Sequence, residues 1–149
     1  MSNSSEGSTL SLTAKERLLI VVLRIIGVVL ISAIFPVFFP SSWIVTLNDQ
    51  LGLADFPDQP LSWYLARSLS LMYFAHGVIV LSLSTDLRRY WPLIRVLGYL
   101  NVILGIVLTG IDVVTTMPVW WTAGEGPSVI LGGCALLVLV RLCEKERNA

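Results

Sequence analysis

Residues 18–39 read LLIVVLRIIGVVLISAIFPVFF, an apolar run that only Arg24 interrupts with a charge. About 20 such residues suffice to cross the hydrocarbon core of a bilayer as an α-helix. A signal peptide would have a shorter apolar region and a small-residue cleavage site, whereas this run ends in FPVFFPSSW. We therefore predict a retained membrane span that ends near Pro36 or Pro40.

Three further apolar runs follow, at about residues 62–85, 93–115 and 127–142. Each is apolar nearly all round, as is typical of helices embedded in lipid. Only 13% of the 149 residues are charged and 55% are hydrophobic, whereas soluble domains carry about 25% charged residues. The sequence predicts an all-α polytopic membrane protein, with a four-transmembrane-helix bundle in residues 15–149 and a disordered cytoplasmic tail in residues 1–14.

The charges predict how the chain is oriented in the membrane. Basic residues lie before the first span, at the short loop between the second and third spans, and after the last span. The remaining loops are acidic except for Arg67. The positive-inside rule then places both termini and the loop between the second and third spans in the cytoplasm. All five tryptophans lie at predicted span ends, as in an interfacial aromatic belt. We expect a multi-pass protein of the inner (plasma) membrane, surrounded by the lipid bilayer. The basic residues on the cytoplasmic side are Lys15, Arg17, Arg88, Arg89, Arg95, Arg141, Lys145 and Arg147.

The first outer loop, residues 41–61, contains apolar residues at helical spacing. Trp43, Leu47 and Leu51 are four residues apart, which predicts a short amphipathic helix lying at the membrane surface. An irregular loop is the alternative.

Charged residues within the outer ends of the spans form a predicted cluster. Arg67 and Asp112 are equally far from the turn at Arg89 and Tyr90, so an antiparallel hairpin would place them at one depth. Opposite charges could neutralise each other there. Glu125 should lie at a similar depth as a third member. The alternative is that Arg67 and Asp112 each reach outward to the headgroups separately.

Small and polar residues form a stripe along the third span, at spacings of three and four. We expect a close helix contact along it, with Asn101 hydrogen-bonding across the contact. His76 lies within a turn of the depth of Asn101, and Tyr73 is one turn from His76, so we predict a buried His76–Asn101 hydrogen bond. A proton relay or a metal or haem ligand is the alternative for His76, although one histidine cannot make a closed metal site. The stripe consists of Gly98, Asn101, Gly105, Thr109 (or Leu108) and Asp112.

Two further features have a structural and a functional reading. Arg24 lies inside the first span, where its side chain either reaches back to the headgroups or contacts an anionic lipid or partner subunit. Glu125 precedes Pro127, which suits the first turn of a helix, and the helix dipole favours a carboxylate there. Ser128 and Gly132 form a pair of small residues, and Gly133 follows them, which predicts a helix-packing face.

The sequence lacks the usual signatures of catalysis, metal binding and nucleic-acid binding. It contains no HExxH, no GxSxG and no phosphate-binding glycine loop. Cys134 and Cys143 would lie about 13 Å apart on one helix, too far for a disulfide. The net charge is zero, which gives no case for nucleic-acid binding. We predict no catalytic residue, no metal site and no cofactor, with a membrane enzyme as the less favoured alternative.

Three segments together resemble the small bacterial four-span proteins of unknown function around the DoxX-like and BphX-like families. They are WYLARSLSLMYFAHG at residues 63–77, DLRRYWPLI at 86–94 and GEGP at 124–127. The resemblance covers about residues 62–142 and implies a four-helix bundle. Some family members associate with redox partners, but no cofactor ligand in this sequence matches that role.

Three functions compete on this evidence. The small-residue faces favour a structural or accessory subunit that packs against itself, as a homo-oligomer, or within a larger membrane complex. The second hypothesis is a bundle that binds or carries a lipophilic small molecule or lipid, and the third is a membrane redox component or enzyme around His76. A wide apolar cavity would favour the second, and a tightly packed interior would favour the first.

Overall fold

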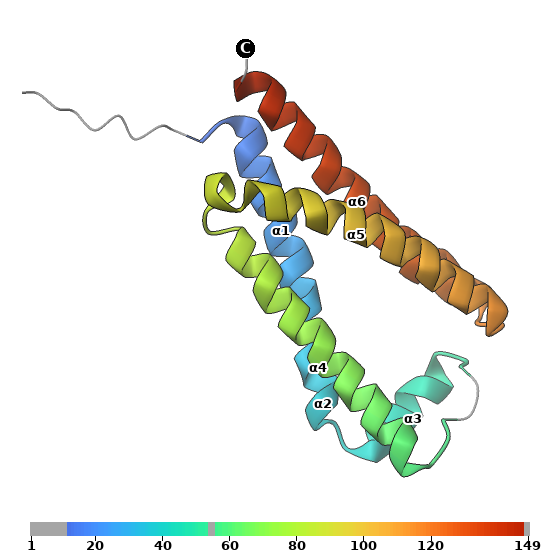
Figure 1. Ribbon diagram of the computed structural model, residues 1–149. Helices are drawn as coiled ribbons and strands as arrows, with labels where there is room; N and C mark the ends of the chain where they lie inside the picture. The colour runs from blue at the N-terminus through green and yellow to red at the C-terminus, as the bar shows by residue number, and fades with distance from the viewer. Residues whose placement is uncertain (1–11, 54–55, 148–149) are drawn as a thin grey trace, which may run out of the picture.

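The computed structural model describes residues 12–53 and 56–147, so most of the predicted tail at residues 1–14 lies outside the described part. The described chain consists of helices with short connections (Figure 1). Four of its helical segments are long and apolar enough to cross a membrane, which confirms the predicted four-span, all-α bundle. The elements are α1 (Ala14–Ile31), the 3-10 turn η1 (Ser32–Ile34), α2 (Phe35–Phe38), α3 (Ser41–Gln50), α4 (Pro60–Leu83), α5 (Leu87–Val114) and α6 (Val119–Arg147).

The first span begins with a capping box. The Thr13 hydroxyl accepts a hydrogen bond from Glu16 N at 3.2 Å, and Thr13 N donates to Glu16 Oε2 at 2.9 Å. These bonds satisfy backbone donors that a helix start otherwise leaves free. The span continues through η1 and α2 to Phe38, close to its predicted end near Pro36 or Pro40.

The outer loop contains the predicted short helix, α3, rather than an irregular segment. It starts directly after Pro40, whose fixed φ suits a helix start. Trp43 and Leu47 lie on α3 with 58% and 44% of their surface exposed. An exposed apolar surface of this kind fits a helix that contacts lipid headgroups.

The last span is longer than predicted, because α6 begins at Val119 and not at Pro127. Pro127 therefore lies inside the helix, and Glu125 is in its second turn rather than before its start. We predicted Pro127 as a helix start because it lacks a backbone N–H donor, but in a membrane span neighbouring groups can compensate for that missing donor.

The four spans form two hairpins that meet at one end and diverge toward the other (Figure 1). α1 packs along α4, and α5 packs along α6. α4 and α5 are close only next to the short turn that joins them. The molecule is therefore wedge-shaped rather than a bundle packed along its whole length.

Glycines bring α5 and α6 into backbone contact. A Cβ atom on Gly105 would lie 2.6 Å from the carbonyl oxygen of Gly126, and one on Gly98 would lie 3.3 Å from that of Gly133. In return, a Cβ atom on Gly133 would lie 2.7 Å from the carbonyl oxygen of Gly98. The two glycines of each helix are seven residues apart, so both contacts lie along one line of the antiparallel pair. We call this line, formed by Gly98, Gly105, Gly126 and Gly133, the glycine seam. Small residues allow this approach, which replaces the hydrophobic effect as the source of helix association in lipid.

The α1–α4 hairpin has a similar contact at a single level. A Cβ atom on Gly77 of α4 would lie 2.7 Å from Ile31 N and 2.9 Å from the carbonyl oxygen of Gly27. Gly27 in turn faces Leu81, whose backbone nitrogen would be 3.2 Å from a Cβ atom there. Each hairpin thus has its own close-packed seam, and neither seam extends across the space between the hairpins.

The hydrophobic core lies where the hairpins meet. All four spans contribute side chains to it, and those of α5 recur every three or four residues. The wedge is therefore packed at one end. The core residues are Leu19, Leu23, Val80, Leu83, Leu87, Trp91, Ile94, Leu97, Leu136, Leu139, Val140 and Cys143.

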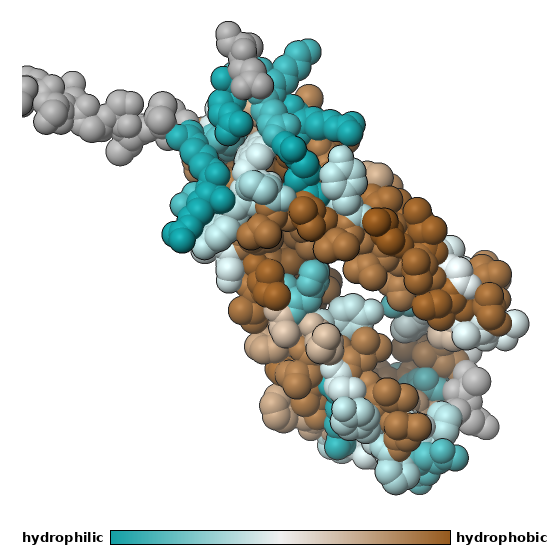
Figure 2. Space-filling model, viewed as in Figure 1, coloured by the Kyte–Doolittle hydropathy of each residue, from teal (hydrophilic) through white to brown (hydrophobic). Residues whose placement is uncertain are grey.

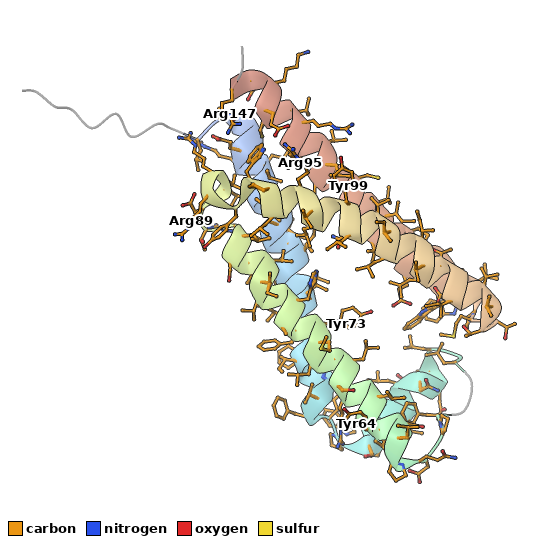
Figure 3. The ribbon with its side chains drawn as sticks, in the orientation of Figure 1. Tyr64, Tyr73, Arg89, Arg95, Tyr99 and Arg147 are labelled. Carbon is orange, nitrogen blue, oxygen red and sulfur yellow. The ribbon has the colours of Figure 1, made fainter. Side chains whose placement is uncertain are left out.

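Polar contacts fasten the packed end. Glu144 of α6 accepts hydrogen bonds from Trp91 Nε1 at 2.7 Å and from the guanidinium of Arg95, both on α5. Arg147 lies over the Trp91 ring, 5.9 Å from its centroid. Figure 3 shows Arg89, Arg95 and Arg147 gathered at this end. We refer to the surface formed by Lys15, Glu16, Arg88, Arg95, Glu144, Glu146 and Arg147 as the charged end.

Two ion pairs join α1 to the second hairpin. Lys15 Nζ is 2.6 Å from Glu146 Oε1, and Arg88 Nε is 3.5 Å from Glu16 Oε1. The three basic regions of the sequence therefore share one end, as predicted, and hydrophilic residues cover that end in Figure 2.

The glycine seam yields a first prediction. Gly105→Ala and Gly126→Ala should each destabilise the fold by about 1–3 kcal/mol, because the added methyl group forces the two backbones apart. Gly110→Ala and Gly124→Ala are matched controls in the same helices, since a Cβ atom at either site meets nothing within 4 Å. The controls should be neutral or stabilising by up to about 1 kcal/mol. Loss of helical circular dichroism during titration with a denaturing detergent measures the effect, and equal losses at all four positions would contradict the seam.

The charged end yields a second prediction. Glu144→Gln should cost about 1–2 kcal/mol, because Glu144 is only 26% exposed and serves two donors. Glu146→Gln should leave stability nearly unchanged, because its pair with Lys15 is open to solvent. The same detergent titration compares the two variants. If Glu146→Gln reduced stability more than Glu144→Gln, Glu144 would not make the larger contribution to the stability of the charged end.

Candidate functional site

A cavity of about 430 Å³ lies between the two hairpins, beyond the packed core. All four spans line it, and Figure 2 shows the surface hollowed between the diverging hairpins. Most of the wall is aliphatic, with polar groups on three of the helices. The lining residues are Ile25, Ile26, Val29, Leu30, Tyr73, His76, Asn101, Leu104, Leu108, Glu125, Ser128, Val129 and Gly132.

Helical periodicity explains the apolar wall. Ile25, Ile26, Val29 and Leu30 recur at four-residue spacing on α1 and therefore share a face. Leu104 and Leu108 do the same on α5. Apolar residues surround each span, so the sequence offered no signal that these particular side chains would face a cavity.

Tyr73 and His76 bring polar atoms from α4. They are three residues apart, so both lie on the same side of the helix. Figure 3 shows Tyr73 on the side of α4 that faces the second hairpin. Both side chains are partly buried, and no hydrogen bond joins either of them to another of the described side chains.

Asn101 enters the cavity from α5, where it lies between Gly98 and Gly105 of the seam. It is 8% exposed. The predicted hydrogen bond between Asn101 and His76 is absent from the described residues. The two side chains reach the cavity from different hairpins, and the divergence of the hairpins separates them.

Among the described residues of the lining, Glu125 is the only carboxylate. Its Oε2 accepts a hydrogen bond from Trp121 Nε1 at 2.6 Å, one turn earlier on α6. Its Oε1 has no hydrogen-bond partner in residues 12–53 and 56–147. Glu125 and Ser128 also line a second hollow of about 400 Å³ with Trp120, Trp121 and Gly124. The Glu125 carboxylate therefore lies where the cavity adjoins the second hollow, near the outer end of α6.

The predicted pair of Arg67 and Asp112 is not formed. None of the three ion pairs among the described residues includes either side chain. Arg67 is exposed and lies beside Val37, Trp63 and Tyr64 on the first hairpin. The pair would form only if α4 and α5 stayed adjacent along their length, but the two helices diverge beyond the turn that joins them.

Asp112 instead lies buried at the outer end of α5, with 5% of its surface exposed. Its Oδ2 has no hydrogen-bond partner within the described chain. It does not line the cavity. Glu125 is thus separate from both Arg67 and Asp112, and the predicted three-member charge cluster is wrong.

The predicted packing face of α6 is only partly as expected. Ser128 and Gly132 face the cavity rather than a packed helix, and a Cβ atom on Gly132 would meet only Ile26 Cδ1, at 3.8 Å. Gly133, which the prediction included, does pack against α5, together with Gly126. Arg24 is exposed on α1 and has no ion-pair partner among the described residues.

The site thus combines four predicted residues, Tyr73, His76, Asn101 and Glu125, in one apolar cavity. Within residues 12–53 and 56–147, no three His, Cys, Asp or Glu side chains gather as metal ligands would. Cys134 and Cys143 are both free. The arrangement offers shape, an apolar surface and a few hydrogen-bonding groups, which are the means of binding a small molecule.

Comparison with known proteins leaves the family open. No family model matches the chain, no curated protein is similar to it, and no solved structure matches its fold. The resemblance to DoxX-like and BphX-like proteins therefore stays a prediction, and the chain is a small multi-pass membrane protein whose four spans enclose an apolar cavity.

Proposed function

We propose that this membrane protein binds a lipophilic small molecule or lipid between its two helix hairpins. The cavity of about 430 Å³ carries the proposal. Sites for small molecules typically measure about 300–1,000 Å³ and combine apolar walls with a few placed polar groups. Tyr73, His76, Asn101 and Glu125 supply those groups here.

The competing proposal, an accessory subunit, loses its original motivation. It relied on the small residues of the third and fourth spans as faces for another protein. Gly98 and Gly105 are already occupied by Gly133 and Gly126 of the same chain. Ser128 and Gly132 face the cavity. These small residues therefore support internal packing and ligand space, and partner proteins stay a separate question.

The proposed setting is the inner membrane of a bacterial cell, with the charged end in the cytoplasm. The positive-inside rule supports this orientation, because the basic residues of three separate segments lie at that end. The cavity then opens in the outer half of the membrane, where its polar side chains could meet a ligand that enters from the lipid or from outside.

Cysteine labelling tests the orientation. In a Cys134→Ala, Cys143→Ala background, an impermeant maleimide added to intact cells should label Gln50→Cys and not Arg89→Cys, since both positions are exposed but lie at opposite ends. Permeabilised cells provide the control for Arg89→Cys. Labelling of Arg89→Cys in intact cells would reverse the orientation.

Binding of a lipophilic dye to the wild type and to a variant with a filled cavity tests the binding function. We expect the chain in lipid nanodiscs to bind N-phenyl-1-naphthylamine, a lipophilic dye that is uncharged at neutral pH, saturably and above the signal of empty nanodiscs. Gly132→Leu should weaken binding about tenfold or more, because its side chain occupies the cavity. Gly110→Leu adds the same side chain on an open surface and should leave binding unchanged. Equal dye uptake by wild type and Gly132→Leu would refute the cavity as the binding site.

A further inference from the structure

We infer that the cavity selects lipophilic cations. The inference rests on the proposed binding function and specifies the chemical class of its ligand. Its basis is the position of Glu125 in an apolar cavity whose described lining contains no lysine or arginine.

The cavity lining contains few ionisable side chains. Among the described residues that line it, Glu125 is the only carboxylate, His76 is the one histidine, and none is a lysine or arginine. The nearest candidates from the sequence do not fill that gap, because Arg67 lies on the outer surface of the first hairpin and Arg24 is exposed on α1 without lining the cavity.

The Glu125 carboxylate is held through one of its two oxygens. Trp121 Nε1 fixes Oε2 through a hydrogen bond of 2.6 Å, while Oε1 has no partner within the described chain. A free oxygen on an oriented carboxylate is available to a positively charged guest. Coulomb attraction there is stronger than in water, because the apolar walls lower the local dielectric.

Aromatic side chains also line the cavity and the adjoining hollow. Tyr73 lines the cavity on the opposite hairpin, and Trp120 and Trp121 line the adjoining hollow with Glu125. Ring faces attract cations, most strongly when water is excluded. The aliphatic side chains of α1 and α5 complete the wall and suit the apolar body of such a ligand. An anion would meet Glu125 with no lysine or arginine in the described lining to offset the repulsion.

Two probes of matched size and shape but opposite charge test this inference: tetraphenylphosphonium and tetraphenylborate. Each is titrated against N-phenyl-1-naphthylamine bound to the wild-type chain in nanodiscs, with free ion concentrations read by ion-selective electrodes. We expect tetraphenylphosphonium to displace the dye at a concentration at least about tenfold lower than tetraphenylborate. Equal potency, or a preference for the anion, overturns the inference.

Substitutions test whether Glu125 causes the preference for the cation over the anion. Glu125→Gln should still bind the dye saturably but lose the preference for the cation, measured against its own dye affinity, whereas Glu125→Asp should keep the preference. Asp112→Asn is the matched control, because it removes a buried carboxylate that does not line the cavity, and it should leave the preference intact. A preference that survives in Glu125→Gln contradicts the assignment to Glu125. Absence of dye binding to the wild type would instead reject the proposed binding function itself, so the two failures are distinguishable.

Discussion

Gly105 and Gly126 bring the backbones of α5 and α6 so close that a single methyl group at either site would lie 2.6–2.7 Å from a carbonyl oxygen of the other helix. This contact, repeated at Gly98 and Gly133, turns the last two spans into a rigid antiparallel pair. In lipid, such close packing is a main source of helix association, because apolar side chains gain little by leaving one apolar environment for another. The seam uses one face of each helix and leaves the adjacent faces free. Glu125 precedes Gly126 directly and Asn101 lies between Gly98 and Gly105, so both cavity side chains are positioned by the close-packed helix pair.

The cavity exists because the two hairpins are joined at one end only. Hydrophobic core, ion pairs and the Glu144 hydrogen bonds all lie at the charged end, where α1, α5 and α6 meet. Beyond the core, each hairpin keeps its own glycine contact, but no seam connects them. A lipid chain or a ligand in the space between them would gain packing contacts that empty apolar space lacks.

Charge placement separates structural roles from the proposed binding role. The charges of the charged end are paired with one another across helices and hold the spans together. Glu125 differs in that its only described partner is the neutral indole of Trp121. A charged side chain within a membrane span is costly and is typically retained for function. Glu125 lines the cavity with one carboxylate oxygen that has no hydrogen-bond partner within the described chain, and this is where the proposed charged guest would bind.

Much of the architecture was decided by the sequence itself. Apolar length predicted four spans, basic residues predicted which segments share an end, and the spacing of Trp43 and Leu47 predicted α3, because each of these depends only on local composition and period. The sequence also singled out Tyr73, His76, Asn101 and Glu125 as polar groups within the spans. It misjudged their partners, because the pairing of Arg67 with Asp112 and of His76 with Asn101 assumed that consecutive spans stay adjacent. Only the tertiary structure decided that α4 diverges from α5, that Gly126 joins the predicted Gly133 in the packing face of α6 while Ser128 and Gly132 face the cavity, and that a cavity lies between the hairpins. The sequence did mark the stripe with Gly98 and Gly105 as a contact face of α5, but which face of which helix packs against it depends on how small residues on two different helices fit together.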